Sequence, residues 1–159
     1  MLRRSVLVVA VVLVSSGLVL AQNADSAWTG SWKLNVAKSK WSPSSGALKS
    51  QTSKATDTAN GVMVVTDQVD AAGKAQHTEI TYKFDGKEYE LKGAPQANTT
   101  RIYSKIDAHT YQFVTRVGGT ATTTSKVAIA ADGKTRTITT TGKNANGETV
   151  SNVTAWDKQ

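Results

Sequence analysis

Two histidines, His77 and His109, are the side chains best suited to metal binding or acid–base chemistry in a sequence without cysteine. A metal site needs several ligands grouped together, and neither histidine belongs to such a cluster. His77 and Glu79 are two residues apart, which on a β-strand places both on one face. One histidine and one carboxylate are too few ligands to indicate a metal site, and we interpret the two side chains as a solvated surface pair. The sequence therefore predicts no metal and no cofactor.

Nucleophilic and paired-carboxylate chemistry also lack a recognisable arrangement. The sequence has no Gly-x-Ser-x-Gly motif, which would place a nucleophilic serine on a sharp turn. Glu88 and Glu90 alternate with Tyr89 and Leu91, a pattern typical of the solvated face of a strand rather than of a glycosidase pair. We therefore expect a protein that is not an enzyme.

Four tryptophans are further candidates for ligand contact: Trp28, Trp32, Trp41 and Trp156. The even spacing of Trp28 and Trp32 places them on one strand face. The set forms either an aromatic wall for a hydrophobic ligand or part of the core, because each ring buries a large area. We interpret Trp32 and Trp156 as core residues. For Trp41, which lies beside Pro43 in a predicted loop, both interpretations stay open.

Turn-forming dipeptides divide the rest of the sequence into short segments. They are Asn60-Gly61, Ala72-Gly73, Asp85-Gly86, Gly118-Gly119, Asp132-Gly133 and Asn146-Gly147. Asn-Gly and Asp-Gly favour two-residue hairpins because both turn positions adopt positive φ. The segments between them are rich in Thr, Val, Ile and Tyr, which favour strands. We predict nine or ten strands, near residues 28–34, 48–57, 62–70, 75–84, 87–92, 98–106, 110–117, 121–130, 134–142 and 148–156.

Alternation of apolar and polar residues predicts which strand faces are buried. The predicted buried sets are Ile80, Tyr82 and Phe84; Ile102 and Ile106, opposite Arg101, Tyr103 and Lys105; and Tyr111, Phe113 and Val117. Strands with one buried and one solvated face are typical of antiparallel meanders. The sequence predicts an all-β fold, an antiparallel up-and-down β-barrel of eight to ten strands. The Ser- and Lys-rich segment from Lys38 to Ser53 is predicted to be a long loop over one barrel end.

The first 21 residues have the pattern of a secretory signal peptide. Arg3 and Arg4 precede an apolar stretch, Val6 to Leu20, and cleavage is expected before Gln22. An uncleaved membrane anchor is the alternative, but the apolar stretch is short for a span of about 20 residues. The sequence thus predicts a single domain, residues 22–159, in the periplasm or outside the cell, without stable membrane insertion.

The predicted mature chain carries a formal charge of +5 once Arg3 and Arg4 are removed from the total of +7. Its lysines are spread over nearly every segment, whereas nucleic-acid binding favours a concentrated basic patch with interleaved aromatic residues. We expect no nucleic-acid partner and a monomer. Because there is no cysteine to form a disulfide, stability must come from packing and from sheet hydrogen bonds.

Gly30-Ser31-Trp32 on the first strand, followed by a meander of hairpins, resembles the calycin group of lipocalins and fatty-acid-binding proteins. The resemblance implies a lipocalin-like barrel in which the tryptophan plugs one end and packs against a basic side chain from a late strand. The stretch from Gly30 to Lys40 also resembles the opening of a set of small secreted bacterial proteins of unknown function.

Two departures from fatty-acid-binding proteins affect the expected ligand. Those proteins grip a carboxylate with an Arg-x-Tyr on the last strand, where this sequence has Thr154, and they carry a two-helix lid that the segment from Lys38 to Ser53 is too short to form. A buried carboxylate without a partner is costly. We therefore expect a neutral or cationic ligand rather than a fatty acid.

Two classes of function remain. In the first, the barrel holds a small, partly apolar or amphipathic ligand. Its mouth would lie near Trp41, and its interior would be lined by Tyr82, Phe84, Tyr111 and Phe113. In the second, the protein is a structural or interaction module of the cell envelope that binds protein or polymer through its loops and outer face. The threonines of the Thr-rich strands either line a cavity or face solvent. A cavity inside the barrel would favour the first class, and a filled barrel would favour the second.

Overall fold

The computed structural model describes residues 27–144 and 146–159, which form ten β-strands and one turn of 3-10 helix. The elements are β1 (Gly30–Lys40), η1 (Ser44–Gly46), β2 (Leu48–Thr58), β3 (Gly61–Asp70), β4 (Ala75–Tyr82), β5 (Glu88–Glu90), β6 (Thr99–Lys105), β7 (Thr110–Val117), β8 (Thr120–Ile129), β9 (Thr135–Lys143) and β10 (Thr149–Lys158). The predicted signal peptide lies outside the described residues. Within them, no helix has the length and apolar character needed to cross a membrane.

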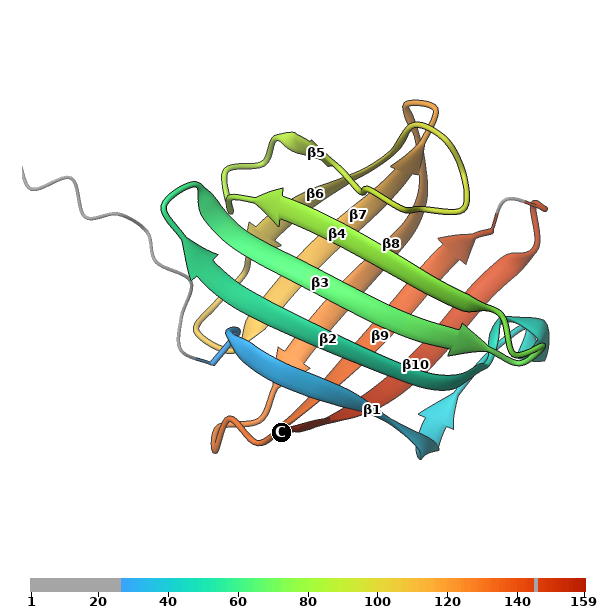
Figure 1. Ribbon diagram of the computed structural model, residues 1–159, viewed down its shortest axis with the longest axis horizontal. Coiled ribbons are helices and arrows are strands. Elements are labelled where there is room, and N and C mark those ends of the chain that lie inside the picture. Colours follow the sequence, from blue (N-terminus) through green and yellow to red (C-terminus); the bar gives the residue numbers. More distant parts are fainter. Residues whose placement is uncertain (1–26, 145) are drawn as a thin grey trace, which may run out of the picture.

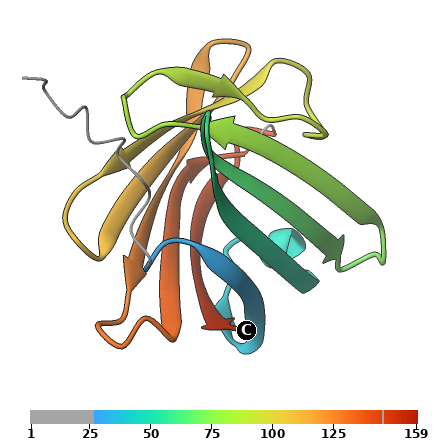
Figure 2. The ribbon, with the colours of Figure 1, turned by 60° about the vertical axis from the view of Figure 1, so that its left-hand side comes forward.

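All ten strands belong to one antiparallel sheet in the order β4-β3-β2-β1-β10-β9-β8-β7-β6-β5. Because β1 pairs with β10, the sheet wraps round on itself, as Figures 1 and 2 show. The gap between β4 and β5 is bridged by Glu79 and Lys92, whose backbones exchange hydrogen bonds of 3.1 and 2.9 Å. The predicted up-and-down antiparallel barrel is confirmed as a nearly closed barrel of ten strands.

The connection between the first two strands is shorter than the predicted loop from Lys38 to Ser53. β1 continues through Lys40 after a bulge, and β2 already begins at Leu48. Ser39 stabilises the bulge, because its hydroxyl donates to the Asn35 carbonyl (2.7 Å) and accepts from the Ala155 N–H (3.0 Å). The Ser- and Lys-rich composition reflects solvated strand ends rather than a loop.

Alternation identifies the buried face correctly on β4 and incorrectly on β6. Ile80 and Tyr82 are buried in the core as predicted. On β6, Tyr103 is buried, while Ile106, which follows the strand and was expected inside, is 55% exposed. Tyr103 stacks on Tyr82 with ring centroids 3.5 Å apart, so the larger aromatic ring takes the inner face. The same inversion turns Arg101 toward the interior, where it lines a cavity.

Trp32 is 1% exposed and anchors the closed part of the core. Its indole N–H donates to the Trp28 carbonyl (3.3 Å), and the Arg136 guanidinium from β9 lies 4.6 Å from the centre of its ring. This contact matches the basic side chain from a late strand that the resemblance implied. Gly30 adopts a φ of +115°, and a Cβ there would lie 2.7 Å from Cε of Lys158. The Gly-x-Trp pattern therefore reflects both backbone conformation and close packing.

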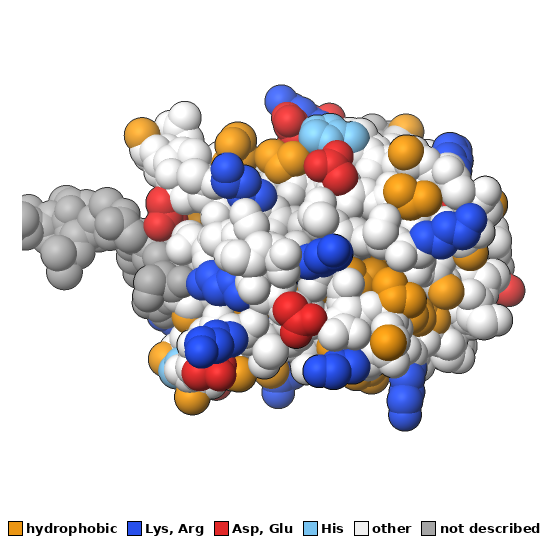
Figure 3. Space-filling view, turned by 60° about the horizontal axis from the view of Figure 1, so that its bottom comes forward, with side chains coloured by type: hydrophobic (Ala, Val, Ile, Leu, Met, Phe, Trp, Pro, Cys, Tyr) orange, Lys and Arg blue, Asp and Glu red, His pale blue; other side chains and the backbone are white. Residues whose placement is uncertain are grey.

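The outer surface carries lysines, acidic residues and apolar side chains interspersed with one another. Figure 3 shows this mixture on one face of the barrel, with apolar groups in small separate areas. Of the large apolar side chains in the described ranges, Val36, Met63, Ile106 and Val153 are exposed.

Candidate functional site

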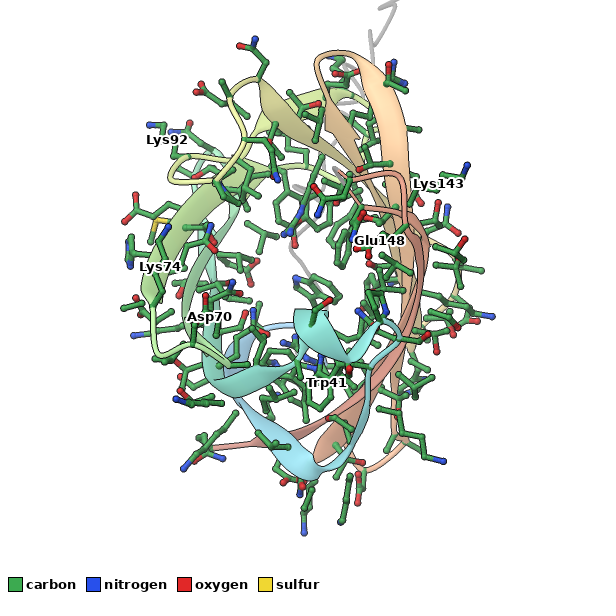
Figure 4. All side chains as sticks on the ribbon, turned by 90° about the vertical axis from the view of Figure 1, so that its right-hand side faces the viewer. Trp41, Asp70, Lys74, Lys92, Lys143 and Glu148 are labelled. Atoms are coloured by element: carbon green, nitrogen blue, oxygen red, sulfur yellow. The ribbon has the colours of Figure 1, made fainter. Side chains whose placement is uncertain are left out.

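The barrel encloses a cavity of about 410 Å³ to which nearly every strand contributes. Its wall includes Trp41, Gly46 and Leu48 around η1, and the segment 94–96 that follows β5. Figure 4 looks into the end of the barrel that carries η1, where the Trp41 side chain lies within the opening. The cavity therefore opens beside Trp41 and η1.

One wall of the cavity carries a ladder of three glutamine amides across β2, β3 and β4. The Gln51 amide donates to Gln68 (3.0 Å), Gln68 donates to Gln76 (2.9 Å), and Gln76 donates to the Gly93 carbonyl (3.2 Å). The three residues are direct partners in the sheet register, which aligns them. Each amide has two N–H donors and a carbonyl oxygen with two acceptor sites. The ladder can therefore hydrogen-bond a ligand while remaining intact.

Hydroxyl groups cover much of the remaining wall. They come from Ser53, Thr66, Thr78, Thr99, Thr115, Thr123, Ser125, Thr140 and Thr154. Some are already paired: Ser125 and Thr140 are 2.8 Å apart, and the Trp156 indole donates to Thr154 (3.0 Å). The Thr-rich strands thus divide by alternation, with one set of hydroxyls inside the barrel and the other in solvent. Inside, they favour a ligand with a polar part.

Two arginines also line the cavity. Arg136 is 6% exposed, and its guanidinium lies 4.6 and 4.7 Å from the ring centres of Trp32 and Trp156. Burial lowers the pKa of Arg136 to about 9, so the group still carries its charge at neutral pH. The Arg101 guanidinium lies 4.7 Å from the centre of the Phe113 ring and 3.5 Å from the Tyr103 hydroxyl. Among the described residues that line the cavity there is no aspartate or glutamate.

Of the five residues predicted to contact a ligand, two line the cavity and three do not. Trp41 and Phe113 line the cavity. Tyr82, Phe84 and Tyr111 instead belong to an aromatic cluster outside the lining, with ring centroids 5.4 Å apart for both Tyr82–Phe84 and Phe84–Tyr111. Tyr82 and Tyr111 are fully buried, and burial raises the pKa of Tyr82 well above its ordinary value. These rings fill one end of the barrel by packing on one another.

Sequence reasoning missed the arginines and the glutamine ladder. The signal for Arg136 was its spacing, because it alternates with Ile138 and Thr140 on the inner face of β9. For Arg101 the corresponding signal was its position two residues before Tyr103. In both strands the apolar pattern was too weak to identify the buried face.

His77 lies on the outer face of β4 and contacts two carboxylates. Its ring nitrogens are 2.6 Å from Asp67 on β3 and 3.3 Å from Glu79. Hydrogen bonds to Asp67, and then to Glu79, raise the pKa of His77. The His77 and Glu79 side chains are 55% and 51% exposed, which confirms the predicted surface pair. Across residues 27–144 and 146–159 no three side chains of metal-ligating type form a group that could hold an ion. The absence of a metal requirement stays a prediction.

Comparison with known proteins does not assign the chain to a family. No protein-family model matches the sequence, and no curated protein matches it significantly. The cavity is therefore interpreted from its own residues and geometry.

Proposed function

We propose that this protein is an exported, calycin-like barrel that binds a small amphipathic ligand in its interior. The observation that carries the proposal is the cavity of about 410 Å³ with a mouth beside Trp41. Small-molecule sites commonly measure about 300–1,000 Å³, so the cavity is large enough for one small ligand. Export rests on the N-terminal pattern of the sequence, and the calycin assignment rests on Gly30-Ser31-Trp32 and the meander.

The composition of the wall supports an amphipathic ligand rather than a purely apolar one. Trp41, Leu48 and Phe113 offer apolar contact, whereas the glutamine ladder and the threonine hydroxyls offer hydrogen bonds. A purely apolar ligand would leave these buried polar groups without partners once it displaced their water, which is costly. A ligand with one polar and one apolar part satisfies both kinds of wall.

A titration with phenylnaphthylamine, a neutral probe that fluoresces in apolar surroundings, tests the proposal. We expect saturable binding of one probe per protein. Thr78→Phe fills the cavity from β4 and should weaken binding at least about tenfold. Thr81→Phe adds the same ring to the exposed face of the same strand and is the matched control. Binding that is absent, or equal in both folded variants, would leave the outer-face interaction module as the better account.

A further inference from the structure

Arg101 and Arg136 bring positive charge into the cavity wall without a carboxylate to balance it. Their side chains form no ion pair with any described residue, and the Nε group of each is buried without a hydrogen-bond partner. Buried charges in proteins are normally paired, because an isolated one loses its hydration without compensation. Arg136 is such a buried charge, and Arg101 is partly buried with a buried Nε, so the cavity wall favours an anionic ligand.

The aromatic rings around the arginines account for part of this environment but not for all of it. Trp32 and Trp156 interact with the charge of Arg136, and Phe113 with that of Arg101. A ring face attracts a cation, yet it does not replace an acceptor lying in the plane of the guanidinium. Packing against Trp32 explains why Arg136 is tolerated as part of the barrel plug. It does not explain Arg101, which lies on another strand.

Both guanidinium groups belong to the wall of the same cavity, which Tyr103 also lines. Arg101 approaches the Tyr103 hydroxyl to 3.5 Å, and Tyr82 and Tyr103 act electrostatically on the pKa of Arg136, in the direction opposite to burial. The tyrosine rings are 3.5 Å apart and nearly parallel, which fixes them as one unit. The arginines thus line one cavity, from β6 and β9.

We infer that the amphipathic ligand of the proposed function is an organic acid whose anionic group binds between Arg101 and Arg136. The planar fork of a guanidinium matches a carboxylate, and two of them would neutralise and hydrogen-bond it in place. This inference rests on the proposed function and names the chemical class of its ligand. The sequence alone predicts a neutral or cationic ligand, because Thr154 stands where an arginine of the last strand would bind a carboxylate. In the structure the cationic side chains come from β6 and β9 instead, so we expect an anionic ligand. A cationic ligand would meet two like charges there.

Two probes with the same ring system distinguish the contribution of ligand charge to binding from the contribution of ligand shape. Anilinonaphthalene sulfonate is phenylnaphthylamine with an added anionic group, and the ratio of their dissociation constants reports the preference for an anion. We expect the sulfonate to bind the wild-type protein at least about tenfold more tightly. Arg101→Gln should bring the two affinities close together, because it weakens binding of the sulfonate much more than binding of the neutral probe. Arg136→Met should do the same, but it changes the core, so Arg101→Gln is the decisive variant.

Arg116→Gln is the matched control for net charge. Arg116 pairs with Glu88 at 3.0 Å and does not line the cavity, so its loss should leave the ratio unchanged. Equal binding of the two probes to the wild-type protein, or an equal effect of Arg101→Gln and Arg116→Gln, would overturn the inference while leaving the proposed function intact. Failure of both probes to bind would overturn the proposed function itself.

Discussion

Arg136 is proposed to bind the anionic group of the ligand, but its burial is expected to destabilise the protein without ligand. Its contacts with Trp32 and Trp156 are each worth roughly 0.5–2 kcal/mol. Removing a guanidinium from water without a carboxylate costs several kcal/mol even after relaxation. Desolvation therefore outweighs the aromatic contacts, in agreement with a pKa lowered to about 9. On this account Arg136 costs stability in the empty barrel.

Replacement of Arg136 by methionine tests that balance. Methionine keeps much of the volume and removes the buried charge, so we expect Arg136→Met to raise the free energy of unfolding by about 1–2 kcal/mol. Denaturant titration at neutral pH without ligand measures the change. A loss of more than about 1 kcal/mol would instead identify Arg136 as a stabilising part of the plug.

For Trp32 we expect the opposite effect of substitution on the free energy of unfolding, because its side chain only stabilises the core. The side chain is 1% exposed and lies between Trp28, Arg136 and Lys158. Trp32→Ala should lower the free energy of unfolding by about 3–5 kcal/mol. The same denaturant titration measures it, with Trp41→Ala in the partly buried mouth as a milder comparison. A loss below about 1 kcal/mol would contradict the assignment of Trp32 to the core.

At the level of elements, pairing in the sheet creates contacts that linear spacing does not display. Sequence spacing places His77 beside Glu79, but the register of β3 on β4 adds Asp67 opposite His77. Both carboxylates raise the pKa of His77, Asp67 the more. A histidine whose pKa is raised on folding contributes stability that is fully present below its unfolded pKa of 6.5. That contribution is lost as the pH rises through the higher pKa of the folded state.

Asp67→Asn tests this linkage. We expect the substitution to lower the pKa of His77, measured by NMR titration of its ring protons, because it removes the largest cause of the shift. The difference in stability between the wild-type protein and the variant should be greatest at acidic pH and shrink as His77 loses its proton. Glu79→Gln should act in the same direction with a smaller effect. An unchanged titration midpoint in Asp67→Asn would show that the contact does not persist in solution.

The strands could be predicted from the sequence because turn dipeptides and strand-forming residues are local signals. Sequence alternation also placed Ile80 and Tyr82 inside. It failed on β6, where an isoleucine pattern competed with Tyr103 and burial was decided by stacking on β4. Trp41 and Phe113 of the cavity wall were predicted from the sequence, whereas Arg101, Arg136 and the glutamine ladder were not. Whether Tyr82, Phe84 and Tyr111 line a space or fill it depends on how rings from distant strands meet.

For the molecule as a whole, polarity is divided along the interior of the barrel. Aromatic rings pack together around Trp28 and Tyr111 (4.6 Å between centroids), while amides and hydroxyls line the cavity that opens beside Trp41. The cavity wall is cationic through Arg101 and Arg136. We therefore propose that this interior holds an amphipathic organic acid.

A crystal structure of the protein grown with anilinonaphthalene sulfonate tests this claim most directly. We predict one probe molecule inside the barrel, with sulfonate oxygens within about 3 Å of guanidinium nitrogens of Arg101 and Arg136. Its rings should lie against Phe113 and toward Trp41. A sulfonate bound only at surface lysines, with nothing but solvent inside the barrel, would contradict the account.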